Sequence, residues 1–589
     1  MFVEPPDVDV STLPRNAAGQ HELILIARRD PGRFCYRYRW DGVDQTTQPT
    51  IHVHRGERFA LRLVNEIAGP SPGEAVASSA LPACAPMAMP PVAAIEHPGY
   101  LHHTSDVRYM HMKPVDTNMH LHGFEGPASQ ENIFLSTLST PMHACEYDLT
   151  VPRTQPPGTY FYHSHAHGMS EAEVFLGLSG MWIVEPDVPQ LPRSQEHPVI
   201  LRYALPEVDD NTFAPVTDPL FSAAAVHEGL AHPAPAIRYD PFDPPAMPST
   251  VPMRHGDIAL DAAGCYGAFN SPLVSINGAK ATVTIDVAAD VPHLFRILNA
   301  TTDSIKLLRL RDALGHGEPF KVVARDGIPV GGDDDRPLAK YEAMQALPLP
   351  PAGRADILLT PHAGTDLTLY SDHFCTGPVG EAVLKHDLLV IHPTTAQPGA
   401  AGRIESTPLD MHQSAAAKLV AYARANPALV RRRAITYTDY GLPKTRHTPE
   451  QIAMFITDTT DRNFREHQFW PVFAPGHNEP AHADIVVKAG SVEEWTLFNT
   501  TLEPHSFHIH QMAFAVENDS SGSPAMLDTV IVPFGKMRPN KADPNYPLVQ
   551  PSATRIVLDF RHVPRGTFVF HCHMLFHEDH GMMGVVRVE

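Results

Sequence analysis

Four short histidine clusters in the sequence have residue types and a spacing that suit metal binding. They are His120-Leu-His122, His163-Ser-His165, His505-Ser-Phe-His508-Ile-His510, and His571-Cys572-His573 followed by His577 and Met582. Side chains two residues apart on a β-strand point to the same face, so each His-x-His pair can present two imidazoles together. One such pair among 36 histidines would carry little weight. Four clusters at matching places in the first and last thirds of the chain, one with a cysteine, predict metal ligands.

The cysteine divides these ligands into two sets. Cys572, His505 and His577, with Met582 as a weak axial candidate, form the thiolate and two-imidazole set that selects copper in electron-transfer sites. Eight histidines remain, namely His120, His122, His163, His165, His508, His510, His571 and His573. Neutral imidazoles favour copper over calcium or magnesium, and eight are too many for one ion, so we expect a cluster of several ions. Zinc is the ordinary alternative, but it rarely needs eight imidazoles in one place.

Internal repeats indicate which elements position the clusters. Two strand-rich phrases recur about every 200 residues, one at 51–65, 284–299 and 484–499, the other at 158–165, 364–373 and 566–573. Alternating apolar and polar residues bounded by Gly and Pro are typical of half-buried strands. We therefore predict β-sandwich domains at 15–190, 191–395 and 425–589, with a linker at 396–424 that includes a helical stretch near Ser414–Ala425. The middle domain has no His-x-His pair and is predicted to be a spacer without copper, whereas the first carries an insert at 68–114 rich in Pro and Ala.

Composition excludes several classes of protein. The chain has 589 residues and a formal net charge of −21, which argues against a nucleic-acid-binding protein or one that docks on an anionic membrane. No apolar run approaches the roughly 20 residues that span a bilayer. The N-terminus, MFVEPPDVDV, has neither the basic segment nor the apolar core of a secretory signal, and the compartment stays open.

We expect a monomer with at most two disulfides among the five cysteines other than Cys572.

The four clusters, in this order, resemble those of the multicopper oxidase family, of the three-domain, laccase-like kind. The closing stretch HCHMLFHEDHGMM at 571–583 is especially similar to bacterial spore-coat laccases, fungal bilirubin oxidases and bacterial cuprous oxidases. The resemblance implies an all-β fold of three consecutive cupredoxin-like Greek-key sandwiches. It also implies four copper ions (one type 1, one type 2 and two type 3) that couple one-electron oxidation of a reducing substrate to four-electron reduction of dioxygen to water. Oxygen-dependent copper chemistry of this kind suits the periplasm or an exported protein.

The resemblance further implies a role for each candidate residue. The type 1 ligands would be His505, Cys572, His577 and Met582, the type 2 ligands His120 and His508, and the type 3 ligands His122, His163, His165, His510, His571 and His573. Two acids are catalytic candidates for proton supply. Glu578 follows His577, and relatives with the same His-Glu-Asp triplet use this glutamate near the dioxygen path. Glu131 lies eleven residues after His120, where family members usually carry Asp beside the type 2 copper.

The reducing substrate stays open at this point. Met582 as axial ligand predicts a low-to-middle potential, which favours phenols, aromatic amines or metal ions. The alternative to a laccase-like enzyme is a metallo-oxidase of Cu(I), Fe(II) or Mn(II), for which methionines of the insert could hold copper: Met87, Met89, Met110 and Met112. A copper-binding protein without turnover is disfavoured by the complete ligand set. A copper nitrite reductase is disfavoured by the His-Cys-His triplet and the three repeats.

Overall fold

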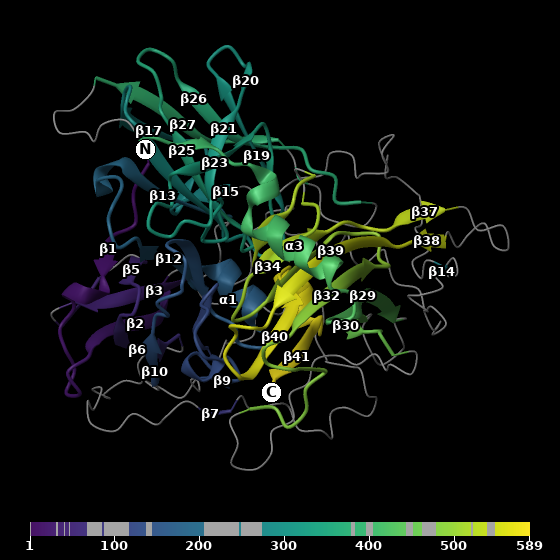
Figure 1. The fold of residues 1–589 in the computed structure, drawn as a ribbon. Helices are drawn as coiled ribbons and strands as arrows, with labels where there is room; N and C mark the ends of the chain where they lie inside the picture. Colours follow the sequence, from purple (N-terminus) through teal and green to yellow (C-terminus); the bar gives the residue numbers. More distant parts are fainter. Residues whose placement is uncertain are drawn as a thin grey trace.

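A computed structural model presents the chain as three successive pairs of β-sheets (Figure 1). It describes residues 2–67 (without 31, 32, 41, 46 and 47), 117–136, 144–204, 274–377, 385–395, 404–442, 451–461, 479–519, 522–538 and 548–589, together with 85–86, 247–248 and 383. The insert predicted at 68–114, with its four methionines, lies outside the described residues except for β7 (Ala85–Pro86), which pairs with β9 (Leu135–Ser136).

The first sheet pair covers the N-terminal third of the chain. One sheet contains, in spatial order, β1 (Asp7–Asp9), β5 (Thr50–His54), β12 (Ser179–Glu185), β11 (Gly158–His163) and β8 (His120–His122). The other contains β10 (Ala144–Thr150), β6 (Arg58–Glu66), β2 (His21–Asp30), β3 (Arg33–Trp40) and β4 (Val43–Asp44). Leu25, Leu61 and Trp182 belong to the core between them. Side chains of β10 alternate between buried and exposed, as expected for a strand with one face on a core.

The second sheet pair follows the same plan. Its larger sheet contains β16 (Ala279–Lys280), β15 (Val274–Ile276), β13 (Glu196–Tyr203), β18 (His293–Asn299), β25 (Arg354–Leu359), β21 (Phe320–Arg325), β23 (Lys340–Met344) and β28 (Thr407–Pro408), with β22 (Ile328–Pro329) beside β21. The other contains β17 (Val283–Ala288), β27 (His386–Thr394), β26 (Leu367–Asp372), β19 (Lys306–Asp312) and β20 (Gly317–Glu318), with β24 (Leu347–Leu349) beside β19. One apolar cluster, which includes Phe295, Ile357 and Leu389, fills the space between these sheets.

The third sheet pair holds the C-terminus. One sheet contains β30 (Gln451–Asp458), β29 (Val430–Leu442), β32 (Val492–Asn499), β39 (Ser552–Asp559), β34 (Phe514–Val516) and β35 (Ala525–Leu527). The other contains β31 (Ile485–Val487), β41 (Met583–Val588), β40 (Gly566–Cys572), β33 (His505–Ile509) and β36 (Thr529–Val532). Trp495, Phe507 and Phe570 pack in its core. A small separate sheet contains β14 (Met247–Pro248), β38 (Leu548–Gln550) and β37 (Lys536–Arg538).

Helices are short in the described part of the chain. They are α1 (Ser170–Leu176), α3 (Ala415–Ala425) and α4 (Leu575–Asp579), with 3-10 turns η1 (Val10–Thr12), η4 (Ala128–Gln130), η5 (Arg193–Gln195) and η7 (Met411–Gln413). The helix predicted near Ser414–Ala425 is confirmed as α3, and the Ser414 hydroxyl caps it by accepting the Ala417 N–H at 3.1 Å. Across the described segments, no helix has the length and apolar character needed to cross a membrane.

The asparagine that ends the first repeated phrase has a structural role in each sheet pair. Asn65 accepts the N–H of Ile67 through its side-chain oxygen. In the third pair, the Asn499 amide donates to the Glu503 carbonyl at 2.7 Å, and its oxygen accepts the Thr501 N–H at 2.8 Å. These bonds close the turn that leads from β32 into β33, where the histidines of the third sheet pair begin.

Candidate metal centre

The register of two strand pairs brings the histidine clusters together. β8 pairs with β11 so that His120 lies opposite His163, with ring centroids 5.2 Å apart. β33 pairs with β40 so that His508 lies opposite His571, with ring centroids 5.3 Å apart. Side chains directly opposite each other on antiparallel strands share a face of the sheet. Each strand pair therefore presents imidazoles from two sequence clusters on one face.

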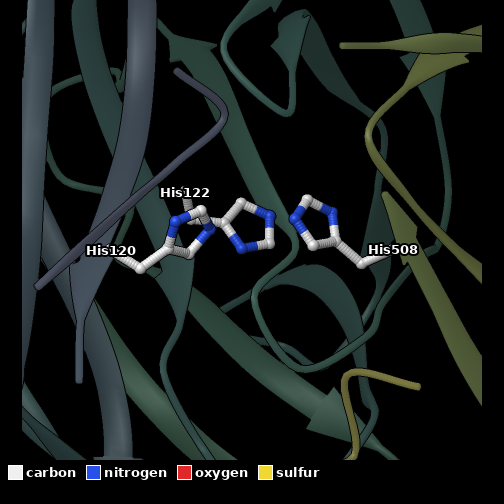
Figure 2. Close-up of side chains that lie close together, drawn as sticks. All are labelled: His120, His122 and His508. Atoms are coloured by element: carbon white, nitrogen blue, oxygen red, sulfur yellow. The ribbon is translucent and has the colours of Figure 1, made fainter. Parts of the chain in front are cut away.

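All eight histidines outside the cysteine set meet in one buried site between the first and third sheet pairs. Their donor atoms lie within 4.8 Å of one another in each of three groups, the first two of which share His122: His120, His122 and His508; His122, His163 and His573; and His165, His510 and His571. Every group combines residues of both sheet pairs. Figure 2 shows the first group, in which His120 and His122 approach His508 from the opposite side. We call these eight residues the eight-histidine cluster.

In two imidazoles of the eight-histidine cluster, one ring nitrogen is hydrogen-bonded to the backbone and the other has no hydrogen-bond partner among the described residues. His163 Nδ1 lies 2.8 Å from the Ser164 carbonyl, and His508 Nδ1 lies 2.7 Å from the Asp528 carbonyl, so each can donate its N–H there. The Nε2 atoms of these two rings are buried and have no hydrogen-bond partner among the described residues. A buried polar atom without a partner costs about 1–3 kcal/mol. Metal ions would satisfy such atoms, and the donor set therefore fits them.

Burial keeps three of these imidazoles, those of His120, His163 and His508, neutral. Loss of solvent lowers the pKa of His163 to about 3. The pKa values of His120 and His508 lie well below the usual range because of burial first and of neighbouring histidines second. Neutral imidazole is the form that binds a metal ion. His120, His163 and His508 thus offer lone pairs, and not positive charges, at neutral pH.

A second group of donor atoms lies around Cys572, on the opposite face of β40. Cys572 Sγ is 3.6 Å from His505 Nδ1 and 3.5 Å from His577 Nδ1, and the two nitrogens are 3.0 Å apart. Such distances are typical of neighbouring ligands of one ion, with metal–nitrogen bonds of about 2.0 Å and metal–sulfur bonds of about 2.3 Å. Met582 is fully buried in the same core, and its carbonyl accepts the Cys572 N–H at 3.0 Å.

The surroundings of this group fix its two imidazoles. His505 Nε2 lies 2.9 Å from the Thr501 hydroxyl, and the Tyr437 ring stacks on the His505 ring at 4.7 Å. His577 Nε2 lies 3.3 Å from Glu503 Oε1. Burial raises the pKa of the Cys572 thiol, so a bound cation is needed to hold the thiolate at neutral pH.

The two acids predicted from the sequence both contact rings of the eight-histidine cluster. Glu578 Oε2 lies 2.9 Å from His571 Nδ1, and its Oε1 lies 3.5 Å from His165 Nδ1. Burial acts to raise the pKa of Glu578, but the attraction of these two histidines outweighs it and the pKa is lowered. Glu131 Oε1 lies 3.0 Å from His120 Nδ1, and burial raises its pKa.

Three charged residues at the centre were missed by sequence reasoning. Asp528 contacts His122, Glu503 contacts His577, and Arg354 forms an ion pair with Asp528. Glu503 could have been found, because it stands two residues before His505. Asp528 and Arg354 carry no such signal, since neither lies in a histidine cluster or in a repeated phrase.

Comparisons with known proteins agree with this geometry. Two family models described as multicopper oxidase match residues 106–188 and 448–589. A laccase from Bacillus stratosphericus is 24% identical over 513 residues, which cover 82% of each chain. A bilirubin oxidase from Albifimbria verrucaria is 32% identical over 135 residues, 22% of each chain.

Solved structures share the fold along the whole chain. The multicopper oxidase McoA from Aquifex aeolicus matches with a TM-score of 0.59 and 18% identity, over 100% of this chain and 99% of that one. A multicopper oxidase from Campylobacter jejuni, described as a metallo-oxidase, matches with a TM-score of 0.54 and 18% identity, over 99% of this chain and 96% of that one. The predicted all-β fold of three consecutive cupredoxin-like sandwiches is thereby confirmed.

Two stretches of the chain, 106–188 and 448–589, thus match multicopper oxidase models, and the chain is similar to multicopper oxidases over most of its length. It is a copper-dependent oxidoreductase with dioxygen as the electron acceptor, as the sequence motifs predicted.

Proposed function

We propose that this multicopper oxidase is laccase-like and couples one-electron oxidation of phenols or aromatic amines to four-electron reduction of dioxygen to water. The observation that carries the proposal is the placement of two donor sets on the two faces of β40, with Cys572 on one face and His571 and His573 in the cluster on the other. Its three sandwich domains would be 15–190, 191–395 and 425–589, with a linker at 396–424. The order of the sheet pairs along the chain supports this division, except that β28 of the linker pairs with β23 of the second sheet pair.

Four copper ions would be held by the two donor sets. We assign the type 1 ion to His505, Cys572, His577 and Met582. The type 2 ion is assigned to His120 and His508, and the type 3 ions to the trios His122, His163, His573 and His165, His510, His571. When bound, copper supplies one-electron redox chemistry and the reduction of dioxygen. The soft thiolate of Cys572 suits copper at the first site, and uncharged imidazoles suit it at the others.

The chain itself contributes an electron path and a proton source. Cys572 is bonded through the backbone to His571 and His573, so few covalent bonds separate the two donor sets. His577 is 5% exposed and is the donor-set residue through which a reducing substrate would be contacted. The Glu578 carboxylate, whose Oε2 lies beside His571 Nδ1, would take up protons and pass them on for water formation.

Oxidation of a metal ion is the second candidate, and Glu503 favours it. The residue is 8% exposed and its carboxylate lies against His577 Nε2, so it places negative charge where a reducing substrate would approach. A cation such as Cu(I), Fe(II) or Mn(II) would be attracted to it, whereas a neutral phenol would gain nothing from the charge.

Oxygen uptake by the copper-loaded protein decides between these substrates. The panel contains phenols, an aromatic amine, bilirubin, Cu(I), Fe(II) and Mn(II), each tested with the wild type and with Glu503→Gln. A laccase-like enzyme has its highest kcat/KM with a phenol or amine, and Glu503→Gln leaves that value nearly unchanged. A highest kcat/KM with a metal ion, lost in Glu503→Gln, would establish the metallo-oxidase instead.

A further inference from the structure

Arg354 on β25 reaches the rim of the eight-histidine cluster from the second sheet pair, which supplies none of its histidines. Its side chain is fully buried and forms a fork on Asp528, with Nη1 donating to Oδ1 at 2.8 Å and Nη2 to Oδ2 at 2.5 Å. The other three N–H groups donate to the carbonyls of Thr159, Ala352 and Asp326 at 3.3, 2.9 and 2.9 Å. All five donors of the guanidinium are used, so its position is fixed.

Asp528 connects this fork to two residues of the cluster. Its Oδ1 lies 3.1 Å from His122 Nε2, and its backbone carbonyl lies 2.7 Å from His508 Nδ1. The Thr529 hydroxyl donates to the same Oδ1 at 2.9 Å. A carboxylate can only accept, so His122 must carry its proton on Nε2, and its Nδ1 lone pair then faces the cluster. His122 Nδ1 is one of the buried nitrogens with no hydrogen-bond partner in the described segments.

Asp326, an aspartate of the second sheet pair, holds the backbone at Asp528. Asp326 Oδ2 accepts the N–H groups of Asp528 and Thr529 at 3.2 and 3.3 Å, while its Oδ1 accepts the N–H of Arg354 at 3.0 Å. Both the carboxylate and the main chain of Asp528 are therefore fixed from the second sheet pair.

The space around the fork is closed. Gly123, next to His122, has φ +87°, and a Cβ there would lie 3.0 Å from both Arg354 Nη2 and Asp528 Oδ2. Tyr160 lies beneath the guanidinium, with its ring centroid 5.7 Å from Arg354 Cζ. Because no side chain fits between Gly123 and the Arg354–Asp528 ion pair, a displacement of this ion pair would also displace the neighbouring His122.

We propose that Arg354 is a positioning residue for the metal cluster: it fixes the Asp528 carboxylate, and through it the tautomer and orientation of His122. This inference rests on the proposed function, because it assumes that the eight histidines bind copper. By this inference the second sheet pair helps to position the metal ligands, although none of the eight histidines belongs to that pair.

The chain offers a matched control in Arg296, on the neighbouring strand β18. Arg296 is also buried and lies within the second sheet pair at its contact with the first, with Nη1 2.8 Å from Asp356 Oδ2 and 3.2 Å from the Thr159 hydroxyl. Its Nη2 donates to Glu196 at 2.7 Å. Arg296→Lys therefore weakens a comparable buried ion pair away from the histidines, whereas Arg354→Lys keeps the charge but removes the fork on Asp528.

The experiment compares the full-length wild type, Arg354→Lys, Asp528→Asn and Arg296→Lys, each loaded with copper and dialysed against a graded series of a copper chelator. The readouts are copper retained per chain, the type 2 copper signal in electron paramagnetic resonance, the blue thiolate-to-copper absorption, and the midpoint of thermal unfolding. We expect Arg354→Lys and Asp528→Asn to lower copper affinity of the eight-histidine cluster by about 10- to 100-fold and to keep the blue absorption. Arg296→Lys should keep both the copper affinity of the eight-histidine cluster and the blue absorption.

Each outcome decides a different claim. Equal copper retention and equal type 2 signals in Arg354→Lys and Arg296→Lys would overturn the inference. If Arg354→Lys fails to fold, Asp528→Asn decides, since the amide keeps the volume of the carboxylate, and wild-type retention in that variant would also overturn it. A wild type that takes up no copper contradicts the proposed function itself, which the positioning inference only assumes.

Discussion

Glu131 Oε1 lies 3.0 Å from His120 Nδ1, so a carboxylate eleven residues further along the chain orients this cluster imidazole. The same carboxylate accepts the Leu121 N–H at 2.6 Å and the Gln511 amide at 2.9 Å. Gln511 directly follows His510 in the third sheet pair. Glu131 therefore binds the first sheet pair to the third at the place where the proposed type 2 site is formed.

Glu131→Ala should weaken copper binding at that site. Loss of the carboxylate frees the His120 ring and leaves the Leu121 N–H buried without its acceptor. A carboxylate behind a metal-binding histidine is typically worth about 10- to 100-fold in metal affinity. Chelator titration followed through the type 2 copper signal measures the change. Glu146→Ala, which removes an exposed carboxylate paired with Arg62, is the control, and equal retention in both variants would refute the assigned role.

Glu578→Gln should slow turnover without loss of copper. The amide keeps the volume of the side chain but cannot hold and release a proton beside His571. Proton transfer by a positioned side chain is worth about 100- to 10,000-fold, so we expect kcat for oxygen uptake to fall by at least about 100-fold. Glu578→Asp should recover part of that loss. A kcat within twofold of wild type at every pH, with copper content intact, would show that another group supplies the proton.

His52 gives the protein a pH-dependent contribution to stability. Burial lowers its pKa, but hydrogen bonds to Asp7 and Glu185 at 3.0 and 2.6 Å outweigh burial and the nearby Arg193, and the pKa lies above 6.5. The contribution is thus fully present below the unfolded pKa and is lost as pH rises through the folded one. Because Asp7 is half exposed, we expect about 1 kcal/mol or less.

Thermal unfolding from about pH 6 to about pH 8 tests this expectation. The stability difference between the wild type and His52→Gln should shrink as pH rises. A difference that stays constant, or that grows with pH, would contradict the raised pKa.

Ser414→Ala should destabilise helix α3. The hydroxyl satisfies the Ala417 N–H at the start of the helix, and loss of such a cap costs about 1 kcal/mol. Ser414→Asp keeps an acceptor and should retain stability. Chemical denaturation, followed by a probe of the third sheet pair, compares the two, because Ala416 and Val420 pack against Val492 of that pair. Equal stability of Ser414→Ala and wild type would exclude the cap as a source of stability.

The histidines and the cysteine that meet in the two donor sets could be singled out from the sequence because their signal is local. His120 and His122 share a strand face, and Cys572 stands between two histidines, so alternation along one strand already separates the donor sets. Alternation of apolar and polar residues likewise indicated the sandwiches. The Arg354–Asp528 pair could not be found in this way, because 174 residues separate its partners and only the contact between sheet pairs unites them.

Copper content and colour of the purified protein test the central claim most directly. We expect four copper ions per wild-type chain, with the blue thiolate-to-copper absorption and oxygen uptake. Cys572→Ser should lose one ion, the blue absorption and turnover together, whereas Cys35→Ser, at a buried cysteine of β3, should keep all three. A wild type that carries only zinc, or a Cys572→Ser variant that still consumes oxygen at the wild-type rate, would contradict the account.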